Sequence, residues 1–243
     1  MAVEPFVPKP ISARTFSETR RIRLSEMDAE GRLRLDSIAR YLQDVAIDDV
    51  DETGWGAPAH LWVLRSIRMQ VLAPSLDDSE VELTTWCSGS ATVAAGRRMS
   101  LVGDRGGRVE VDSVWIHLGP DARPARIEGF GVYAESAGDR TVSTRLELPG
   151  PPATARRLPW ETRASDIDRF GHVNNAVYWQ GVEGRLHDAG IDPRASLDAR
   201  LEYRHAVDLG EAVELAEFSE DGGYGVAFVT EDVLKAVALV QRM

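Results

Sequence analysis

The chain has 243 residues, of which 43% are hydrophobic and 28% charged, as in folded globular proteins of one large or two smaller domains. Its net charge of −11 argues against nucleic acid or an anionic membrane surface as the main partner, because like charges repel. The single cysteine, Cys87, excludes an intrachain disulfide framework and a thiolate metal site. No apolar run approaches a membrane span and the first residues lack a signal-peptide pattern, so we expect a cytoplasmic protein with no membrane span.

The first half opens with a loop-like segment, RIRLSEMDAEG at 21–31, and continues with an amphipathic helix. Apolar residues recur at helical spacing after Asp36, and Gly54 ends the pattern, which predicts a helix near 35–50. Strand-like stretches separated by Pro, Asp and Gly turn signals follow at 61–72, 80–90, 96–104 and 108–118.

The second half repeats this organisation after a linker rich in Pro, Gly, Ala and Arg. Its segment 161–171, ETRASDIDRFG, aligns with the first loop, and a helix is predicted over 174–189. Asn174 or Asn175 can cap this helix, and Gly190 can end it. Strand-like stretches again follow, at 199–207, 212–220, 223–231 and 233–241.

The order strand, loop, helix and four strands thus occurs twice, which indicates an α+β protein with a helix against an antiparallel sheet in each half. We divide the chain into repeats at 16–125 and 156–243 with a linker at 126–155. Gly181 and Gly184 lie inside the second predicted helix, where each costs about 1 kcal/mol relative to alanine. We therefore expect a sheet to approach that helix closely.

The segment from Asp166 to Tyr178 resembles the loop-to-helix signature of hotdog thioesterases, and the rest resembles plant and bacterial acyl-acyl-carrier-protein thioesterases. The similarity covers roughly residues 17–241 and includes YLQDVAIDD (41–49), Trp62-Val63, TTWCSGS (84–90), GRRMSLVGD (96–104), SVWIHL (113–118) and LEYR (201–204). The resemblance implies a double hotdog, in which two sheets join edge to edge, each wraps a helix, and an acyl tunnel lies between the repeats. It also implies no metal and no organic cofactor.

Thioester hydrolysis needs a base or nucleophile, a donor for the developing oxyanion and exclusion of water. Asp168 is the candidate for activating water or attacking the carbonyl, and His172 for assisting proton transfer or orienting the carboxylate. Backbone N–H groups at the start of the following helix can hold the carbonyl oxygen, with Asn174 or Asn175 placing the loop or the water. The alternative is structural, because Asp and Asn are common helix caps.

We expect three residues of this loop to contact substrate, namely Phe170, Gly171 and Val173. We also expect contacts from Glu202 and Arg204 in the strand-like stretch 199–207 and from Trp62 in the stretch 61–72. An ion pair on an exposed strand explains Glu202 and Arg204 equally well, and Trp62 also fits a core position. In the first repeat, Glu26 and Asp28 occupy the equivalent loop, but Arg32-Leu33 stand where the second repeat has His172-Val173. We interpret the first loop as a decayed site that shapes the acyl tunnel.

The sequence departs from the family pattern at three positions. Phe170 replaces an asparagine of the plant enzymes, and Ala206 and Val207 replace a glutamate and a cysteine. No cysteine nucleophile can act from that strand, although the Asp–x3–His–x–Asn pattern of simpler acyl-CoA hotdog enzymes is intact. Our leading hypothesis is a thioesterase of fatty acid biosynthesis that releases fatty acid from acyl-carrier protein or coenzyme A.

The alternatives are a non-catalytic acyl-thioester-binding protein and, more weakly, a hotdog dehydratase or hydratase. We expect a monomer or a homodimer, because fused repeats provide the pairing that single hotdogs achieve by dimerising. We also expect an elongated apolar pocket between the repeats that opens near His172.

Overall fold

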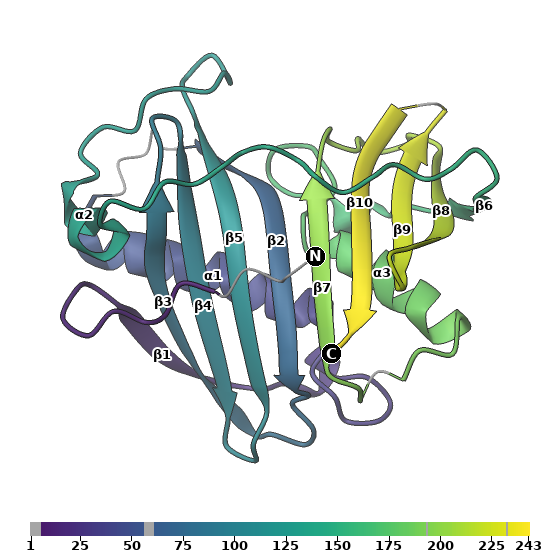
Figure 1. Ribbon diagram of the computed structural model, residues 1–243, viewed down its shortest axis with the longest axis horizontal. Coiled ribbons are helices and arrows are strands. Elements are labelled where there is room, and N and C mark those ends of the chain that lie inside the picture. Colours follow the sequence, from purple (N-terminus) through teal and green to yellow (C-terminus); the bar gives the residue numbers. More distant parts are fainter. Residues whose placement is uncertain (1–5, 56–60, 193, 232) are drawn as a thin grey trace.

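The computed structural model describes residues 6–55, 61–192, 194–231 and 233–243, in which one antiparallel sheet of ten strands carries two helices on one face (Figure 1). The strands of the first half are β1 (Phe16–Arg21), β2 (Leu61–Ala73), β3 (Glu80–Ser90), β4 (Ala94–Gly103) and β5 (Arg108–Leu118). Those of the second half are β6 (Arg156–Trp160), β7 (Leu197–Tyr203), β8 (Val213–Glu220), β9 (Gly223–Thr230) and β10 (Val233–Arg242). The helices are α1 (Leu35–Thr53), α2 (Gly131–Ala137) and α3 (Val177–Asp188).

The strand order shows the duplication directly. It runs β1-β3-β4-β5-β2-β7-β10-β9-β8-β6, so each half has the same order when followed outward from the centre. The halves join through β2 and β7, which pair from Ser66–Glu202 to Val71–Leu197. The double hotdog predicted from the sequence is therefore confirmed, and all eight predicted strands form. The boundaries proposed for the two repeats stay a prediction.

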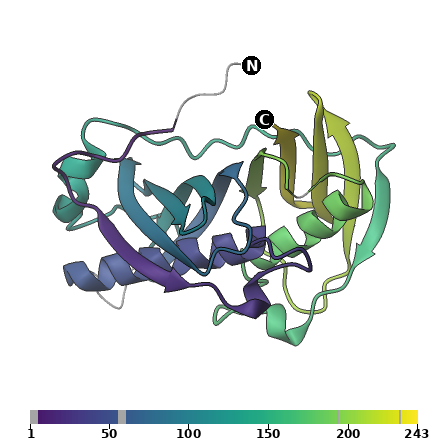
Figure 2. The same ribbon diagram turned by 90° about the horizontal axis from the view of Figure 1, so that it is seen from below.

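The two predicted helices lie on the same face of the sheet and contact each other near the centre of the molecule (Figure 2). α1 starts at Leu35 as predicted and ends where Gly54 adopts a left-handed conformation with φ of 64°. α3 starts at Val177, later than the predicted 174, because Asn174 Oδ1 accepts a hydrogen bond from the backbone N–H of Ala176 at 2.9 Å. That bond fixes a turn before the helix begins. No helix in the described ranges is long and apolar enough to cross a membrane.

The sheet approaches α3 at one of its two glycines. A Cβ at Gly181 would lie 3.0 Å from the ring of Phe228 on β9 and 3.3 Å from the indole nitrogen of Trp160 on β6. The predicted close approach is therefore confirmed at this position. At Gly184 the prediction is wrong, because no atom lies within 4 Å of such a Cβ.

Side chains of β7 alternate between the helix side and the outer face of the sheet, as the pleat requires. Leu201 and Tyr203 belong to the core, whereas Asp198 points to the outer face, where it accepts hydrogen bonds from Arg68 Nε at 2.9 Å and from Gln70 Nε2 at 3.0 Å. Arg68 and Gln70 lie on β2, so this buried ion pair ties the two repeats together.

The linker crosses the outer face of the sheet, opposite the helices, and includes α2 (Figures 1 and 2). Glu202 Oε1 accepts hydrogen bonds from the backbone N–H groups of Glu147 at 2.7 Å and Leu148 at 3.1 Å. Arg204 donates to Leu148 O at 2.6 Å, and Arg65 of β2 donates to Thr144 O at 3.3 Å. The linker is thus fastened beside the junction between the repeats.

Candidate active site

The loop of the second repeat folds as a tight turn around Asp168 and His172. After β6 the chain makes a short 3₁₀ turn, Ala164–Asp166, and then reverses direction. The backbone N–H of Asp168 donates to His172 O at 2.8 Å, and that of Gly171 donates to Asp168 O at 3.0 Å. Gly171 has φ of 85°, a conformation that glycine adopts at little cost. The glycine therefore allows the carboxylate and the imidazole to share one turn.

One oxygen of Asp168 shapes this turn and the other is available. Oδ1 accepts hydrogen bonds from the backbone N–H of Phe170 at 2.8 Å and of His172 at 3.5 Å. No group in the described part of the chain donates to Oδ2. The side chain is partly exposed, so Oδ2 can meet a water molecule or a substrate.

The imidazole of His172 turns toward a carboxylate that sequence reasoning missed. His172 Nδ1 lies 2.6 Å from Asp208 Oδ1, and the two residues also form an isolated backbone bridge. Next to this bridge, the backbone N–H of Val173 donates to Val207 O at 2.8 Å. Asp208 comes directly after the positions where the family carries its glutamate and cysteine, and that neighbourhood was the only signal in the sequence that could have identified it.

The two asparagines before α3 have different roles. Asn174 uses its side-chain oxygen for the turn that precedes the helix. Asn175 accepts a hydrogen bond from the Tyr203 hydroxyl at its backbone oxygen, at 2.8 Å. Among the described residues, nothing bonds its backbone N–H or its side-chain amide. These donors lie at the N-terminal end of α3, where the helix dipole favours negative charge.

Of the residues predicted to bind substrate, three lie in or next to the turn. Phe170 is half exposed, with the guanidinium carbon of Arg169 5.0 Å from its ring centroid. Gly171 is exposed at the bend, whereas the Val173 side chain is 3% exposed and belongs to the core, and its contact with substrate stays a prediction. Trp62 lies at the start of β2 with its ring 5.3 Å from that of His117. Its role in acyl binding stays a prediction.

Glu202 and Arg204 hydrogen-bond to the linker on the outer face of the sheet. The ion pair that was the alternative explanation for them forms, with Arg204 Nη2 3.5 Å from Glu202 Oε2, and their contact with substrate stays a prediction. The alternation along β7 explains their outward direction, because Tyr203 points to the helix side, where it reaches Asn175, and its neighbours must point away.

The loop of the first repeat has the same fold with different chemistry. Asp28 Oδ1 accepts hydrogen bonds from the backbone N–H of Glu30 and Arg32, and Oδ2 accepts one from Arg32 Nε at 2.9 Å. Arg32 also donates from Nη2 to Glu183 of α3 at 2.7 Å. Burial raises the pKa of Glu183, although Arg32 and the backbone N–H of Leu35 oppose this shift. In this loop both carboxylate oxygens are therefore occupied and an arginine takes the place of the histidine.

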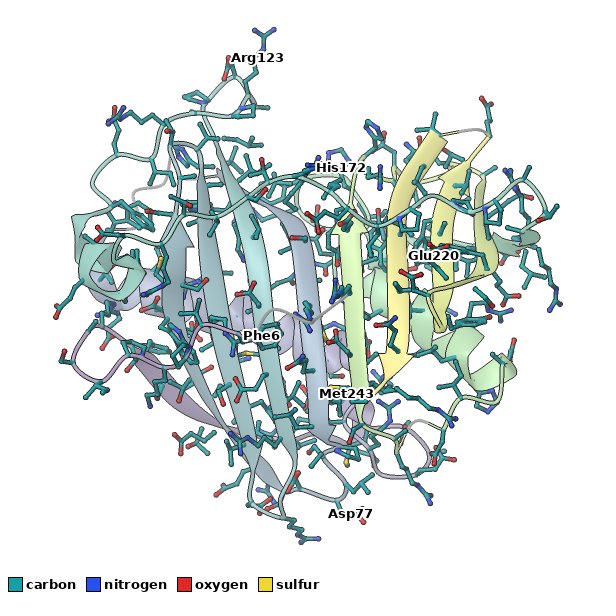
Figure 3. All side chains as sticks on the ribbon, in the orientation of Figure 1. Phe6, Asp77, Arg123, His172, Glu220 and Met243 are labelled. Atoms are coloured by element: carbon teal, nitrogen blue, oxygen red, sulfur yellow. The ribbon has the colours of Figure 1, made fainter. Side chains whose placement is uncertain are left out.

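A cavity of about 170 Å³ lies beside the first loop, lined by Asp28, Arg32, Glu183, Leu186 and Ile191 among others. The first loop is fastened to Asp77, whose backbone N–H donates to Gly31 O at 3.0 Å. Figure 3 shows Asp77 at the lower edge of the molecule and His172 in its upper part, and neither Asp168 nor His172 lines the cavity, so this cavity is not the one expected near His172. The pocket at His172 stays a prediction. The described residues contain no cluster of three or more His, Cys, Asp or Glu side chains able to hold a metal ion.

Comparison with known proteins identifies this arrangement. Residues 13–128 match the acyl-ACP thioesterase N-terminal domain, and residues 151–236 match the acyl-ACP thioesterase C-terminal domain. The chain belongs to the acyl-ACP thioesterase family. It is accordingly a thioester hydrolase, as the sequence predicted.

Similar proteins match over nearly the whole chain. An uncharacterized protein of Mycobacterium tuberculosis (H37Rv) is 28% identical over 240 residues, which cover 98% of this chain and 96% of the relative. The 12:0-ACP thioesterase from Umbellularia californica superposes with a TM-score of 0.77 at 18% identity, covering 94% of this chain and 97% of its own. An acyl-ACP thioesterase from Bacteroides thetaiotaomicron gives a TM-score of 0.71 at 17% identity, with 93% and 96% covered. At these identities the two structures establish the fold of this thioesterase.

Proposed function

We propose that this thioesterase hydrolyses fatty acyl thioesters of acyl-carrier protein or coenzyme A to free fatty acid, with its reacting centre at the loop of the second repeat. The observation that carries the assignment is the open Oδ2 of Asp168 in the same turn as His172. The loop of the first repeat offers no comparable group, because Arg32 occupies its carboxylate.

In the proposed reaction, Asp168 Oδ2 removes a proton from a water molecule that attacks the thioester carbonyl carbon. The unbonded N–H donors of Asn175 hold the negative charge that develops on the carbonyl oxygen. The C–S bond then breaks, and the proton taken from water returns to the thiolate. His172 orients the water and assists the proton transfer. The products are one carboxylic acid and one thiol, so no further reactant is required.

The decisive variant is Asp168→Asn, which preserves the size of the side chain and the hydrogen bonds that shape the turn. We expect the rate of thiol release from acyl-CoA and acyl-ACP to fall by at least ~100-fold, as expected for the loss of a positioned acid–base group, with the thermal unfolding midpoint nearly unchanged. Asp28→Asn is the matched control in the first repeat. Near-wild-type turnover by Asp168→Asn would remove this assignment, and an inactive Asp28→Asn would transfer the site to the first repeat.

Two further outcomes are informative. Incorporation of ¹⁸O from labelled water into Asp168 during a single turnover would identify the carboxylate as the nucleophile and not as the base. Binding of acyl thioesters without turnover by the wild type would favour the non-catalytic alternative, which is motivated by Phe170, Ala206 and Val207. Measuring both acyl donors over a range of chain lengths decides between carrier protein and coenzyme A.

The proposed setting is fatty acid biosynthesis in the cytoplasm, with acyl-carrier protein as a partner and a monomer or homodimer as the active form. The fused junction between β2 and β7 supports the monomer, because it already pairs the two central strands. Analytical ultracentrifugation of the purified protein measures its oligomeric state directly.

A further inference from the structure

The turn that contains Asp208 is anchored to the sheet by a chain of polar contacts. Glu211 Oε2 accepts a hydrogen bond from the backbone N–H of Asp208 at 3.1 Å, and Glu211 Oε1 lies 2.8 Å from Lys235 Nζ on β10. Lys235 also donates to Ala206 O at 2.9 Å, and its side chain is only 11% exposed. Asp208 therefore lies in a turn that is held before it, at Ala206, by Lys235 and after it by Glu211.

This turn places the carboxylate at the Nδ1 edge of the imidazole ring. The 2.6 Å separation between His172 Nδ1 and Asp208 Oδ1 is that of a strong hydrogen bond, and the backbone bridge between the two residues fixes their relative position. A proton held on Nδ1 leaves Nε2 as the nitrogen with a free lone pair.

The first repeat supplies an internal comparison. Its loop makes the same kind of isolated backbone bridge, between Arg32 and Leu76. A leucine thus stands in the first repeat where Asp208 stands in the second. The carboxylate accompanies the histidine and is absent where the histidine is replaced by arginine, which is the pattern expected when the carboxylate serves the imidazole.

We propose that Asp208 is a positioning residue that fixes the tautomer and orientation of His172 so that Nε2 faces the reacting atoms. This role rests on the proposed function, in which His172 orients water and assists proton transfer. Asp208 itself touches the imidazole and not the substrate. Its removal should therefore lower kcat while leaving KM nearly unchanged.

The test compares Asp208→Ala and Asp208→Asn with the wild type. We expect kcat of Asp208→Ala to fall by about 10- to 100-fold, less than the ~10⁴-fold typical of a buried triad aspartate, because both side chains of this pair are exposed to water. Asp208→Asn should lie between Asp208→Ala and the wild type, since its amide oxygen still accepts the Nδ1 proton. The matched control is Asp188→Ala, which removes the carboxylate beside His187 on α3, 3.5 Å from that ring, and should leave kcat unchanged.

A second measurement does not depend on turnover. Nitrogen-15 spectra of the ring should show His172 protonated on Nδ1 in the wild type and a mixture of tautomers in Asp208→Ala. Unchanged ring spectra in Asp208→Ala would overturn the proposal, as would wild-type kcat in that variant while Asp168→Asn is inactive. If the wild type proves inactive on every thioester, the proposed function fails, and the ring spectra still decide whether Asp208 sets the tautomer. If Asp208→Ala does not fold, Asp208→Leu, which places the leucine of the equivalent first-repeat bridge at this position and cannot accept the Nδ1 proton, provides both measurements.

Discussion

Gly181 and Gly184 on α3 allow a quantitative test of how closely the sheet packs on the helix. Replacing either by alanine should gain about 1 kcal/mol from helix propensity. At Gly184 that gain is unopposed, because no atom lies within 4 Å of the new Cβ. At Gly181 the new Cβ would lie 3.0 Å from Phe228 Cε1 and 3.2 Å from Cζ, well inside the 3.5–4.0 Å of an ordinary contact.

The Phe228 ring cannot move away freely. It is fully buried, and its centroid lies 4.8 Å from the Trp160 ring and 4.9 Å from the Tyr178 ring. Overpacking of this kind costs about 1–3 kcal/mol, so Gly181→Ala should be neutral or up to about 2 kcal/mol less stable than the wild type.

Urea unfolding of both variants measures the difference. We expect the free energy of unfolding of Gly184→Ala to be about 1 kcal/mol above that of the wild type. It should also be about 1–3 kcal/mol above that of Gly181→Ala. Equal stabilisation by the two substitutions would refute the reasoning, because the sheet would then leave room at Gly181.

Two other predictions concern the junction and the turn. Burial raises the pKa of Asp198, but hydrogen bonds from Arg68 and Gln70 outweigh that effect and leave its pKa below the ordinary value. The resulting stabilisation is present above the pKa of the unfolded state and is lost as the pH falls through the folded pKa, so Asp198→Asn should cost about 3 kcal/mol or more at pH 7 and less at pH 3 in urea unfolding. An equal cost at both pH values would contradict this. Gly171→Ala should lower the free energy of unfolding by about 1–2 kcal/mol through its positive φ alone, since its Cβ would meet no atom within 4 Å, and an unchanged value would show that the turn relaxes.

The sequence was sufficient for the architecture because the duplication is recorded in local patterns. Strands were predicted from alternating residues, helices from helical spacing and their ends from glycines, and each of these signals depends only on residues near one another in the chain. The observed strands and helices agree with these predictions. The later start of α3 depends on which atom Asn174 bonds, which spacing does not reveal. The error at Gly184 could have been avoided, because the buried residues of α3 form one side of the helix, and that side includes Gly181 but not Gly184.

Contacts between distant segments were the part that sequence reasoning could not supply. His172 and Asp208 meet because two loops pair across 36 positions. Arg32 was correctly singled out as a departure, but its bond to Glu183 crosses between the repeats. For Glu202, strict alternation with the apolar Leu201 and Tyr203 could have predicted an outward side chain.

The bridge from Arg32 to Glu183 forms in one loop and not in the other, which is possible only because the two repeats share one chain. In a symmetric dimer, any substitution appears in both copies, so an arginine that occupies one loop would occupy the other as well. Here the position equivalent to Arg32 is His172, and the position equivalent to Glu183 is Gln43. Gene fusion thus permits one loop to lock the two helices together while its counterpart keeps the polar groups of a reacting centre, and each can change without altering the other.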